Sequence, residues 1–293
     1  MNLTDEDRER IDGCTVVASV SGGKDSAAMS LWLTEQGVEH RRVFADTGWE
    51  HPVTYEYLRG PLTEAIGHIE EVQSHLGGMV DVVRKRKMFP SRLRRFCTDE
   101  LKVRPLSRYV KAIEDDTVNA VGIRAAESRA RQDMPRWEYS ETFDCDVWRP
   151  LIDWTEQDVI DIHTEHGLAP NPLYLRGAER VGCWPCIFSR KREISLVAKL
   201  TPERIDVIRE LEKEVGDGAE ERMAADGKHR NRPTFFHPKG QSESRADFVP
   251  IDEVVEWAGT ARGGRQLLMF DTEPAGCVRW GLCEGHIDDE VEP

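Results

Sequence analysis

The residues Ser21-Gly22-Gly23-Lys24-Asp25-Ser26 follow an apolar run, Val16-Val17-Ala18-Ser19-Val20, and lead into a helical pattern. A glycine-rich turn between a strand and a helix points several backbone N–H groups at one spot, where the helix dipole adds positive potential. Lys24 adds a mobile cation and Ser26 a hydroxyl. The stretch lacks the four-residue spacer of the Walker pattern. It predicts a phosphate or pyrophosphate site, with an ordinary glycine turn as the alternative.

Short β-branched runs alternate with helical patterns through the first half of the chain, which is typical of a doubly wound, mostly parallel α/β sheet. Strands are expected at about residues 15–20, 41–45, 69–72 and 117–123. Three polar motifs then follow strand ends: the glycine turn, Asp46-Thr47-Gly48 and Gly122-Ile123-Arg124. Because the carboxyl edge of an open α/β sheet forms the ligand crevice, we expect these motifs to converge on one cleft.

Helices are expected at about 26–36, from Pro52, at 155–166, at 191–216 with a break near Thr201-Pro202, and at 251–258. Residues 216–248 are polar with few apolar positions, which predicts a long loop or arm. The chain is accordingly divided into an α/β nucleotide-binding domain at 1–180 and a helical, cysteine-bearing C-terminal region at 181–293.

The composition of the 293 residues describes a soluble globular protein with a formal net charge of -14, which argues against general coating of nucleic acid. No apolar stretch approaches the roughly 18 residues of a membrane span, and no basic-then-apolar leader begins the chain. A cytoplasmic location without membrane contact is therefore expected. Seven cysteines in such a chain favour thiol, metal or catalytic roles over a disulfide framework.

The charge is uneven along the sequence. Between Arg84 and Lys111 lie eleven basic residues against only two acidic ones, Asp99 and Glu100. A solvated helical face is one interpretation of this run. A positive wall around a polyanionic substrate, or a local nucleic-acid footprint, is the other.

Five segments occur in an order that resembles the phosphoadenosine phosphosulfate (PAPS) reductase family of the PP-loop ATP pyrophosphatase superfamily. The first is the SGGKDS loop, which matches the SGGxDS PP-loop. The others are Ala45-Asp46-Thr47-Gly48 with Pro52-Val53-Thr54-Tyr55; Phe96-Cys97-Thr98 with Leu101-Lys102-Val103-Arg104-Pro105-Leu106; Gly122-Ile123-Arg124 with Glu127-Ser128-Arg129; and Pro150-Leu151-Ile152-Asp153-Trp154 with Asn171-Pro172-Leu173-Tyr174 and Gly182-Cys183-Trp184-Pro185-Cys186. The resemblance covers about residues 14–190 and implies an adenine nucleotide alpha hydrolase-like fold.

The nucleotide implied by this resemblance is ATP or an adenylyl-sulfate nucleotide with Mg²⁺. Lys24 would offset phosphate charge, and Asp25 would either cap the helix or hold Mg²⁺. Arginines suit bidentate contacts to phosphate or sulfate, with a salt bridge to Glu127 and its neighbours as the alternative. The full set of expected nucleotide-binding residues is Ser21, Gly22, Gly23, Lys24, Asp25, Ser26, Asp46, Thr47, Gly122, Arg124 and Arg129.

Cys183 and Cys186 form a CxxC pair whose spacing lets two thiolates reach one metal or cluster, or lets one thiol attack the other. In iron–sulfur members of the family, a cysteine before LKxxPL joins such a pair, and Cys97 occupies that place. The adenylyl-sulfate reductase pattern has two adjacent cysteines where this chain has Phe96-Cys97. A fourth ligand would come from Cys283, or alternatively Cys277.

The resemblance thus implies a 4Fe–4S cluster, with zinc and redox or inert thiols as alternatives. Two further cysteines, Cys14 and Cys145, lie in apolar, strand-like surroundings and are expected to be buried structural residues.

Two departures from the reductases favour ATP chemistry. The loop keeps Lys24, and the reductases' C-terminal Glu-Cys-Gly-Leu-His segment is scrambled here to Gly281-Leu282-Cys283-Glu284-Gly285-His286. We expect ATP cleavage at the α-phosphate with pyrophosphate release, coupled to sulfur transfer, with Lys24, Asp25 and Cys283 as catalytic residues. The pattern most resembles the DNA phosphorothioation sulfurtransferase-like branch.

Two alternatives stay open. One is a thiol-dependent PAPS or adenylyl-sulfate reductase that makes sulfite. The other is a nucleotide-binding subunit of a nucleic-acid modification or defence complex. The expected partners are a sulfur donor such as a cysteine desulfurase, or a thioredoxin-like reductant. A nucleic-acid acceptor and a homodimer are left open.

Overall fold

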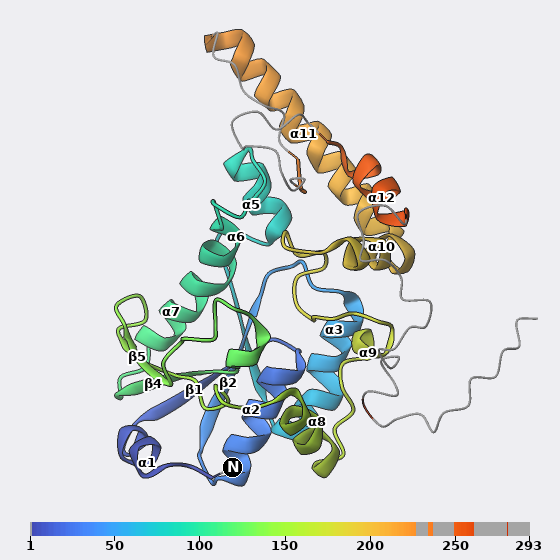
Figure 1. Ribbon diagram of the computed structural model, residues 1–293. Coiled ribbons are helices and arrows are strands. Elements are labelled where there is room, and N and C mark those ends of the chain that lie inside the picture. The colour runs from blue at the N-terminus through green and yellow to red at the C-terminus, as the bar shows by residue number, and fades with distance from the viewer. Residues whose placement is uncertain (1, 227–233, 237–248, 261–279, 281–293) are drawn as a thin grey trace, which may run out of the picture.

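The computed structural model describes residues 2–226, 234–236, 249–260 and Trp280. Its centre is a six-stranded sheet in the order β3-β2-β1-β4-β6-β5. The strands are β1 (Thr15–Val20), β2 (His40–Asp46), β3 (Ile69–Gln73), β4 (Thr117–Val121), β5 (Trp137–Ser140) and β6 (Cys145–Trp148). All neighbouring strands are parallel except β5 and β6, which are antiparallel. The predicted doubly wound, mostly parallel sheet is confirmed (Figure 1).

Alternation along β1 explains why both faces of the sheet are covered. Val16, Ala18 and Val20 pack in a core that includes α2 (Lys24–Glu35) and α8 (Glu156–Glu165). Val17 points to the opposite face, where it packs in a smaller core with Val110 of α7 (Arg104–Lys111). Side chains alternate between faces with a period of two, so a strand buried on both sides is apolar throughout.

The remaining helices of the first half link these layers. They are α3 (Pro52–Tyr57), α4 (Thr63–Ile66), α5 (Met79–Arg86), α6 (Phe96–Thr98) and the short α9 (Pro172–Leu175), with π-helical turns at Leu58–Leu62 and Asp99–Val103 and a 3-10 turn at Ala125–Glu127. Pro52 begins α3 at a favoured first-turn position, as the sequence predicted.

The N-terminal helix α1 (Asp5–Ile11) is anchored to the β5–β6 edge by a single buried carboxylate. Asp7 accepts hydrogen bonds from the indole nitrogens of Trp137 (2.9 Å) and Trp148 (3.0 Å) and from the guanidinium of Arg136 (2.9 Å). Burial raises the pKa of Asp7, but the hydrogen bonds from Arg136 and Thr4 outweigh it and hold that pKa below its ordinary value. One side chain thus fixes a helix onto two strands.

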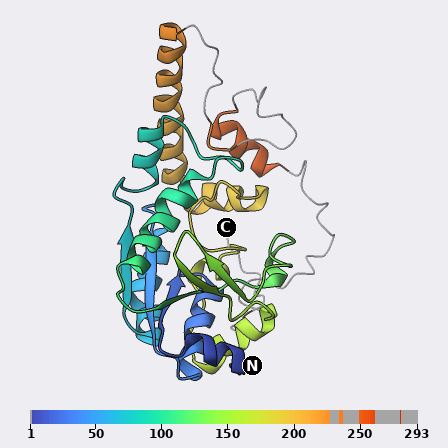
Figure 2. The same cartoon turned by 90° about the vertical axis from the view of Figure 1, so that its left-hand side faces the viewer.

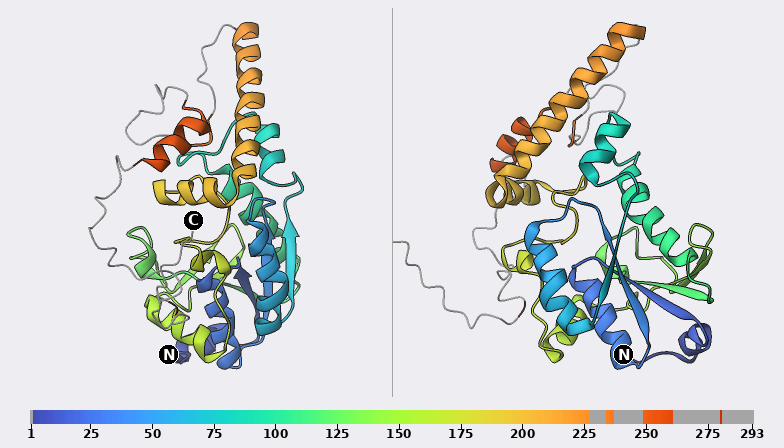
Figure 3. Two further views of the ribbon diagram at one scale, coloured as in Figure 1. Left: turned by 90° about the vertical axis from the view of Figure 1, so that its right-hand side faces the viewer. Right: turned by 180° about the vertical axis from the view of Figure 1, so that it is seen from behind.

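A second core forms a helical cap at the end of the molecule away from α1 (Figure 2). It consists of α10 (Lys191–Leu200), α11 (Pro202–Asp226) and α12 (Ile251–Gly259), packed beside α5. The buried Glu212 joins these parts, since its carboxylate accepts from the backbone N–H groups of Phe235 (3.0 Å) and Ile251 (2.8 Å). Figure 3 shows α11 projecting from this cap.

Two sequence expectations need correction, and one element was missed. The loop or arm expected from residue 216 is helical as far as Asp226, because Leu211, Val215 and Ala219 continue a buried stripe at helical spacing. The β5–β6 hairpin was not predicted. Cys14 is only half-buried, whereas Cys145 is buried as expected.

The cap core joins residues from both sides of the boundary proposed at residue 180, including Leu101 and Leu173 on one side and Ile194 and Ile208 on the other. The division at 180 therefore stays a proposal. Within the described residues, no helix combines the length and apolarity that crossing a membrane requires.

Candidate functional site

In the glycine loop between β1 and α2, the Ser26 hydroxyl forms two hydrogen bonds across the loop. The backbone N–H of Ser21 donates to Ser26 Oγ (3.1 Å), and Ser26 Oγ donates to the carbonyl oxygen of Gly23 (3.0 Å). Gly22 has φ +71°, and a Cβ there would lie 2.9 Å from Thr54 Cγ2. Backbone conformation and space therefore both require glycine at this position.

The end of β4 approaches the loop closely. A Cβ on Gly122 would lie 2.8 Å from the carbonyl oxygen of Asp25, which leaves no room for a side chain. Two residues on, the buried Arg124 forms an ion pair with the Asp25 carboxylate. The predicted convergence of the first and fourth strand ends is therefore present. Asp25 makes no capping bond to α2, so the capping alternative was wrong.

Lys24 is held by carboxylates on either side. Its Nζ lies 3.7 Å from Asp25 Oδ2 and 3.5 Å from Glu156 Oε1 of α8. The same ammonium lies 5.0 Å from the centroid of the Tyr174 ring, and the backbone N–H of Lys24 donates to the Tyr174 hydroxyl (3.2 Å). A polyphosphate at the loop would replace these carboxylates as the partner of Lys24.

Two side chains from the α8–α9 region contact backbone carbonyl oxygens of the loop. His163 Nε2 lies 3.0 Å from the carbonyl oxygen of Lys24, and Asn171 Nδ2 donates to the carbonyl oxygen of Gly22 (3.3 Å). Burial lowers the pKa of His163 and outweighs the raising effect of the Lys24 and Leu168 carbonyl oxygens that face its two ring nitrogens. The Trp280 ring packs against His163 with centroids 5.2 Å apart. We call this region, residues 21–26 with Gly122 and Arg124, the nucleotide corner.

Asp46 and Thr47 lie at the carboxyl end of β2, as predicted, but their side chains are engaged by neighbours. Asp46 accepts hydrogen bonds from the Tyr55 hydroxyl (2.6 Å) and from Gln73 Nε2 (2.5 Å). Thr47 Oγ1 donates to the Glu50 carboxylate (2.7 Å). Arg129 is exposed. Ligand roles for these three predicted residues stay predictions.

The CxxC turn packs against the segment that follows β2. Glu50 and Cys183 form an isolated antiparallel bridge, and the backbone N–H of Trp184 donates to the carbonyl oxygen of Trp49 (2.7 Å). The Cys183 sulfur lies 3.8 Å from Thr47 Oγ1 and 4.0 Å from Glu50 Oε1. The CxxC turn is therefore fixed at the same sheet edge as the nucleotide corner.

Lys102 supplies the positive charge beside this turn. The Cys183 sulfur, and after it the Glu50 carboxylate, raise the pKa of Lys102 against the opposing effect of burial. Burial raises the pKa of the Cys183 thiol, and the Lys102 ammonium partly offsets that shift. We call Cys97, Cys183 and Cys186, with Glu50 and Lys102, the thiol corner.

The three predicted metal ligands lie in one neighbourhood. Cys97 and Cys183 pack in the helical-cap core, and Cys186 accepts from the backbone N–H of Phe188 at 3.5 Å. Burial is the main cause that raises the pKa of Cys97, with Cys186 among the lesser ones. Three thiols suit iron–sulfur or zinc chemistry. In the described part of the chain, however, no three potential ligands are close enough to hold one ion. Cys277 and Cys283 lie outside the described residues.

A small cavity of about 130 Å³ connects the two corners. Ser21 of the loop lines one part of it, and Glu50, Lys102 and Gly182 line another. Its remaining walls come from the ends of β1 and β2 and from α7: Ser19, Val20, Val43, Phe44, Ala45 and Leu106. A nucleotide phosphate at the loop would thus face the lysine beside the CxxC turn.

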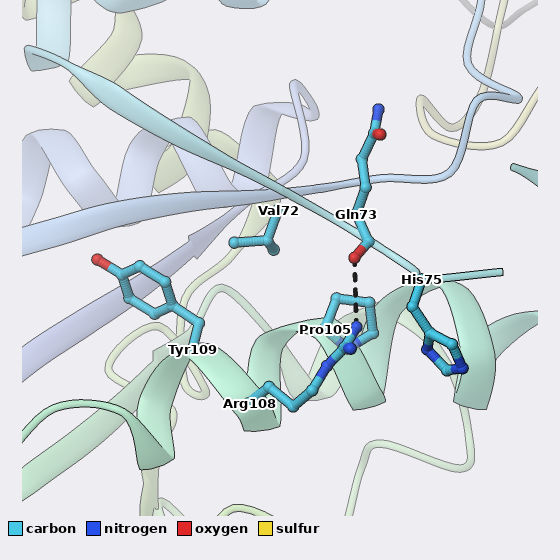
Figure 4. A pocket seen from close by; sticks show the side chains of 6 residues that line it. All are labelled: Val72, Gln73, His75, Pro105, Arg108 and Tyr109. Atoms are coloured by element: carbon cyan, nitrogen blue, oxygen red, sulfur yellow. Dashed lines mark hydrogen bonds between the residues drawn. The ribbon is translucent and has the colours of Figure 1, made fainter. Parts of the chain in front are cut away.

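A second, shallow pocket of about 410 Å³ lies on the β3 edge of the sheet (Figure 4). Arg108 of α7 donates to the carbonyl oxygen of Gln73 there (3.3 Å), and Val72, His75, Pro105 and Tyr109 complete the lining. It contains no cysteine and no residue of the glycine loop at 21–26. The smaller cavity, which touches both corners, is therefore the better candidate site.

Residues 15–189 match the phosphoadenosine phosphosulfate reductase domain family. The chain belongs to this family. An uncharacterized 37.8 kDa protein of Escherichia phage 186 is 33% identical over 92% of this chain and 96% of its own length. An adenosine 5'-phosphosulfate reductase of Allochromatium vinosum is 25% identical over 59% of this chain and 68% of its own.

Among solved structures, the phosphoadenylyl-sulfate reductase of Candida auris is similar, with a TM-score of 0.47 and 18% identity over 64% of this chain and 98% of that one. The reductase-family domain thus contains the loop, Cys97 and the CxxC pair, since all lie within residues 15–189. Family membership is confirmed, as is the doubly wound, mostly parallel α/β sheet. The phosphorothioation branch stays a prediction.

The sequence missed several residues that shape the two corners. Lys102 and Tyr174 stood within motifs that were recognised, yet neither was given a role of its own. Glu50, Glu156 and His163 had no sequence signal beyond their residue type, because their partners are distant along the chain.

Proposed function

We propose that this PAPS reductase-family protein cleaves ATP between the α- and β-phosphates and couples adenylation of an acceptor to sulfur transfer. The observation that carries the proposal is the cavity lined by Ser21 on the loop and by Lys102 and Glu50 at the thiol corner. The retained Lys24 supports ATP over an adenylyl sulfate, because a pyrophosphate leaving group develops more charge at the loop.

In the proposed first step, an acceptor oxygen attacks the α-phosphorus. The bond from that phosphorus to the bridging oxygen breaks, and pyrophosphate leaves with the electron pair. Backbone N–H groups of residues 21–26 and the Lys24 ammonium stabilise the charge on the leaving group. Asp25 is the candidate carboxylate for Mg²⁺, which would offset phosphate charge when bound. Arg124 positions Asp25 through their ion pair.

In the proposed second step, an enzyme persulfide attacks the adenylylated carbon, a carbon–sulfur bond forms and AMP leaves. A thioredoxin-like dithiol then cleaves the sulfur–sulfur bond, which frees the thiolated acceptor and leaves the reductant oxidised. Cys283 is the candidate persulfide carrier, loaded by a sulfur donor such as a cysteine desulfurase. Lys102 would stabilise negative charge at the thiol end of the cavity.

A 4Fe–4S cluster is part of this proposal, with zinc as the alternative. Cys97, Cys183 and Cys186 would hold it, together with Cys277 if Cys283 carries the persulfide, or with Cys283 if it does not. The cluster would supply redox or sulfur-handling chemistry. The test is anaerobic purification followed by iron, sulfide and zinc analysis and a visible spectrum. We expect iron and sulfide that are lost in Cys97→Ser. Stoichiometric zinc without iron would contradict the cluster.

The test of the ATP reaction is pyrophosphate release by the full chain, with ATP and candidate acceptors. We expect release that falls by about 100-fold in Lys24→Ala, as for loss of one transition-state charge partner. Lys111→Ala, which removes an exposed lysine at the end of α7, is the matched control and should keep full release. No release with any acceptor would contradict the proposal.

The alternative is a thiol-dependent reductase that makes sulfite from PAPS or adenylyl sulfate. The relative from Allochromatium vinosum, named as an adenosine 5'-phosphosulfate reductase, supports it. Sulfite production from either nucleotide with thioredoxin, abolished in Cys283→Ser, would favour this reaction over the first. Tight ATP binding without turnover until a partner is added would instead favour a nucleotide-binding subunit.

A further inference from the structure

The segment from residue 84 to residue 95 is the most basic stretch of an acidic protein. Seven of its twelve residues are Lys or Arg and none is acidic, whereas the whole chain has a formal net charge of -14. The segment comprises the end of α5 and the connection to α6, directly before Cys97. A local positive surface therefore borders the thiol corner.

Only part of this charge is neutralised within the molecule. Arg84 pairs with Glu214 of α11, and Arg86 pairs with the buried Glu100. Arg92, Arg94 and Arg95 are exposed, and no carboxylate of the described residues forms an ion pair with them. Three guanidinium groups are thus available to an external anion.

Two of these arginines, Arg92 and Arg95, are placed beside the thiol corner by the Phe188 ring. The Cζ atoms of Arg95 and Arg92 lie 5.0 Å and 5.8 Å from the centroid of the Phe188 ring. The backbone N–H of Phe188 in turn donates to the Cys186 sulfur at 3.5 Å. The side chain of Leu93, between the arginines, is 77% exposed. We call Arg92, Leu93, Arg94, Arg95 and Phe188 the arginine surface.

We infer that the arginine surface binds an unpaired stretch of nucleic acid and holds it beside the thiol corner. Planar guanidinium groups match phosphate oxygens bidentately, and arginine, aromatic and apolar side chains pack on unstacked bases. The cavity between the two corners has a volume of about 130 Å³ and admits one chemical group at a time. An unpaired strand can present a single base to it, whereas a duplex cannot do so without unpairing that base. The inference that this surface presents an acceptor rests on the proposed function, whereas the inference that it binds nucleic acid does not.

The experiment is fluorescence anisotropy of the full chain with labelled single-stranded RNA and DNA oligonucleotides and with the matching duplex, across a salt series. The variant is Arg92→Gln/Arg94→Gln/Arg95→Gln. The control is Arg59→Gln/Arg108→Gln/Lys111→Gln, which removes the same charge from three exposed residues at the β3–α7 side.

We expect single strands to bind more tightly than duplex. The arginine-surface variant should weaken single-strand binding by about tenfold or more and reduce the salt slope by about 2, from three phosphate contacts at roughly 0.7 each. The control should change affinity by less than about threefold. Phe188→Leu, which keeps an apolar side chain, should weaken binding without changing the salt slope.

Equal losses in the variant and the control would overturn the inference, because overall charge alone would then explain binding. Preference for duplex, or equal competition by an acidic peptide, would overturn it too. Pyrophosphate release with ATP and a small acceptor is measured in parallel. Release without strand binding would contradict only the inference, and strand binding without release under any condition would contradict only the proposed function.

Discussion

The nucleotide corner and the thiol corner share one edge of the sheet, but they are built in different ways. The nucleotide corner is a contiguous turn of six residues, completed by close approach of the backbone at Gly122. The thiol corner gathers side chains from segments near residues 50, 97, 102 and 183. Backbone conformation thus shapes the first, with long-range side-chain contacts such as Arg124–Asp25 added to it, whereas long-range side-chain contacts alone assemble the second.

This difference predicts which kind of substitution damages each corner. A glycine replacement should damage the nucleotide corner, because the added Cβ collides with backbone that cannot move independently. A side-chain truncation should damage the thiol corner, because it leaves buried polar partners unsatisfied. The predictions below test this contrast.

The largest effect is expected for Glu50→Ala. The buried Glu50 carboxylate accepts from Thr47 Oγ1 (2.7 Å) and the Tyr55 hydroxyl (3.0 Å) and lies near the Lys102 ammonium. Its removal should lower the free energy of unfolding by about 3–5 kcal/mol, as for breaking a buried charged network. Urea denaturation measures this, with the exposed Glu71→Ala as control at about 0.2–1 kcal/mol. Equal effects at the two positions would refute the contrast.

Gly122→Ala should be next. The added methyl would lie 2.8 Å from the Asp25 carbonyl oxygen and should cost about 1–3 kcal/mol, together with loss of ATP binding. Calorimetric titration with ATP and urea denaturation measure the two effects. Gly218→Ala is the matched control, because a Cβ there meets nothing within 4 Å and a helix gains up to about 1 kcal/mol from alanine. Unchanged ATP affinity in Gly122→Ala would argue against the convergence of β4 on the loop as the binding site.

Acidification should weaken the nucleotide corner through His163. Burial lowers its pKa, so the folded protein keeps the ring neutral while the unfolded chain takes up a proton below about pH 6.5. Stability is therefore fully present above that pH and is lost as pH falls toward the folded pKa. His163→Gln should therefore reduce the loss of unfolding free energy between about pH 7 and pH 5.5.

His40, whose pKa burial lowers to about 4, contributes in the same direction in both proteins and cancels in the comparison. Identical pH slopes for the wild type and His163→Gln would show that the ring supporting Lys24 is already free to protonate in the folded state.

The smallest effect is expected for Arg84→Gln. The ion pair of Arg84 with Glu214 joins α5 to α11 at 3.0 Å, but both side chains are half-exposed. Its loss should change the free energy of unfolding by less than about 1 kcal/mol. A larger change, measured by urea denaturation, would mean that the cap over the thiol corner depends on surface charge as well as on its apolar core.

The sequence predicted most of the fold where local pattern and burial agree. Strands β1 to β4 were identified because each is apolar on one or both faces, whereas β6, which lies inside the sheet, was missed. The β5 strand was missed because Trp137–Ser140 is short and largely unburied. The extension of α11 was missed because Gly216 and Gly218 interrupt the pattern, although Val215 and Ala219 remain buried on the cap.

For the candidate site, the sequence identified residues that carry a motif and missed those that act on it from a distance. The loop and the CxxC pair are readable because their spacing is short. Glu50 and Lys102 meet Cys183 only after the chain has folded, so no spacing along the sequence indicates them. Asp25 is a residue within a motif whose partner was misjudged. Capping of its own helix was one expectation, but its carboxylate pairs with the distant Arg124.

The contacts of Lys24 have a consequence for selectivity. Because the Lys24 ammonium is shared between Asp25 and Glu156, the loop carries its own internal counterions. An incoming anion must displace them, so a singly charged group gains little, whereas a polyphosphate that spans the loop gains several contacts at once. Under the proposed function, the loop is therefore expected to favour a nucleotide triphosphate over the small, singly charged anions that surround it in solution.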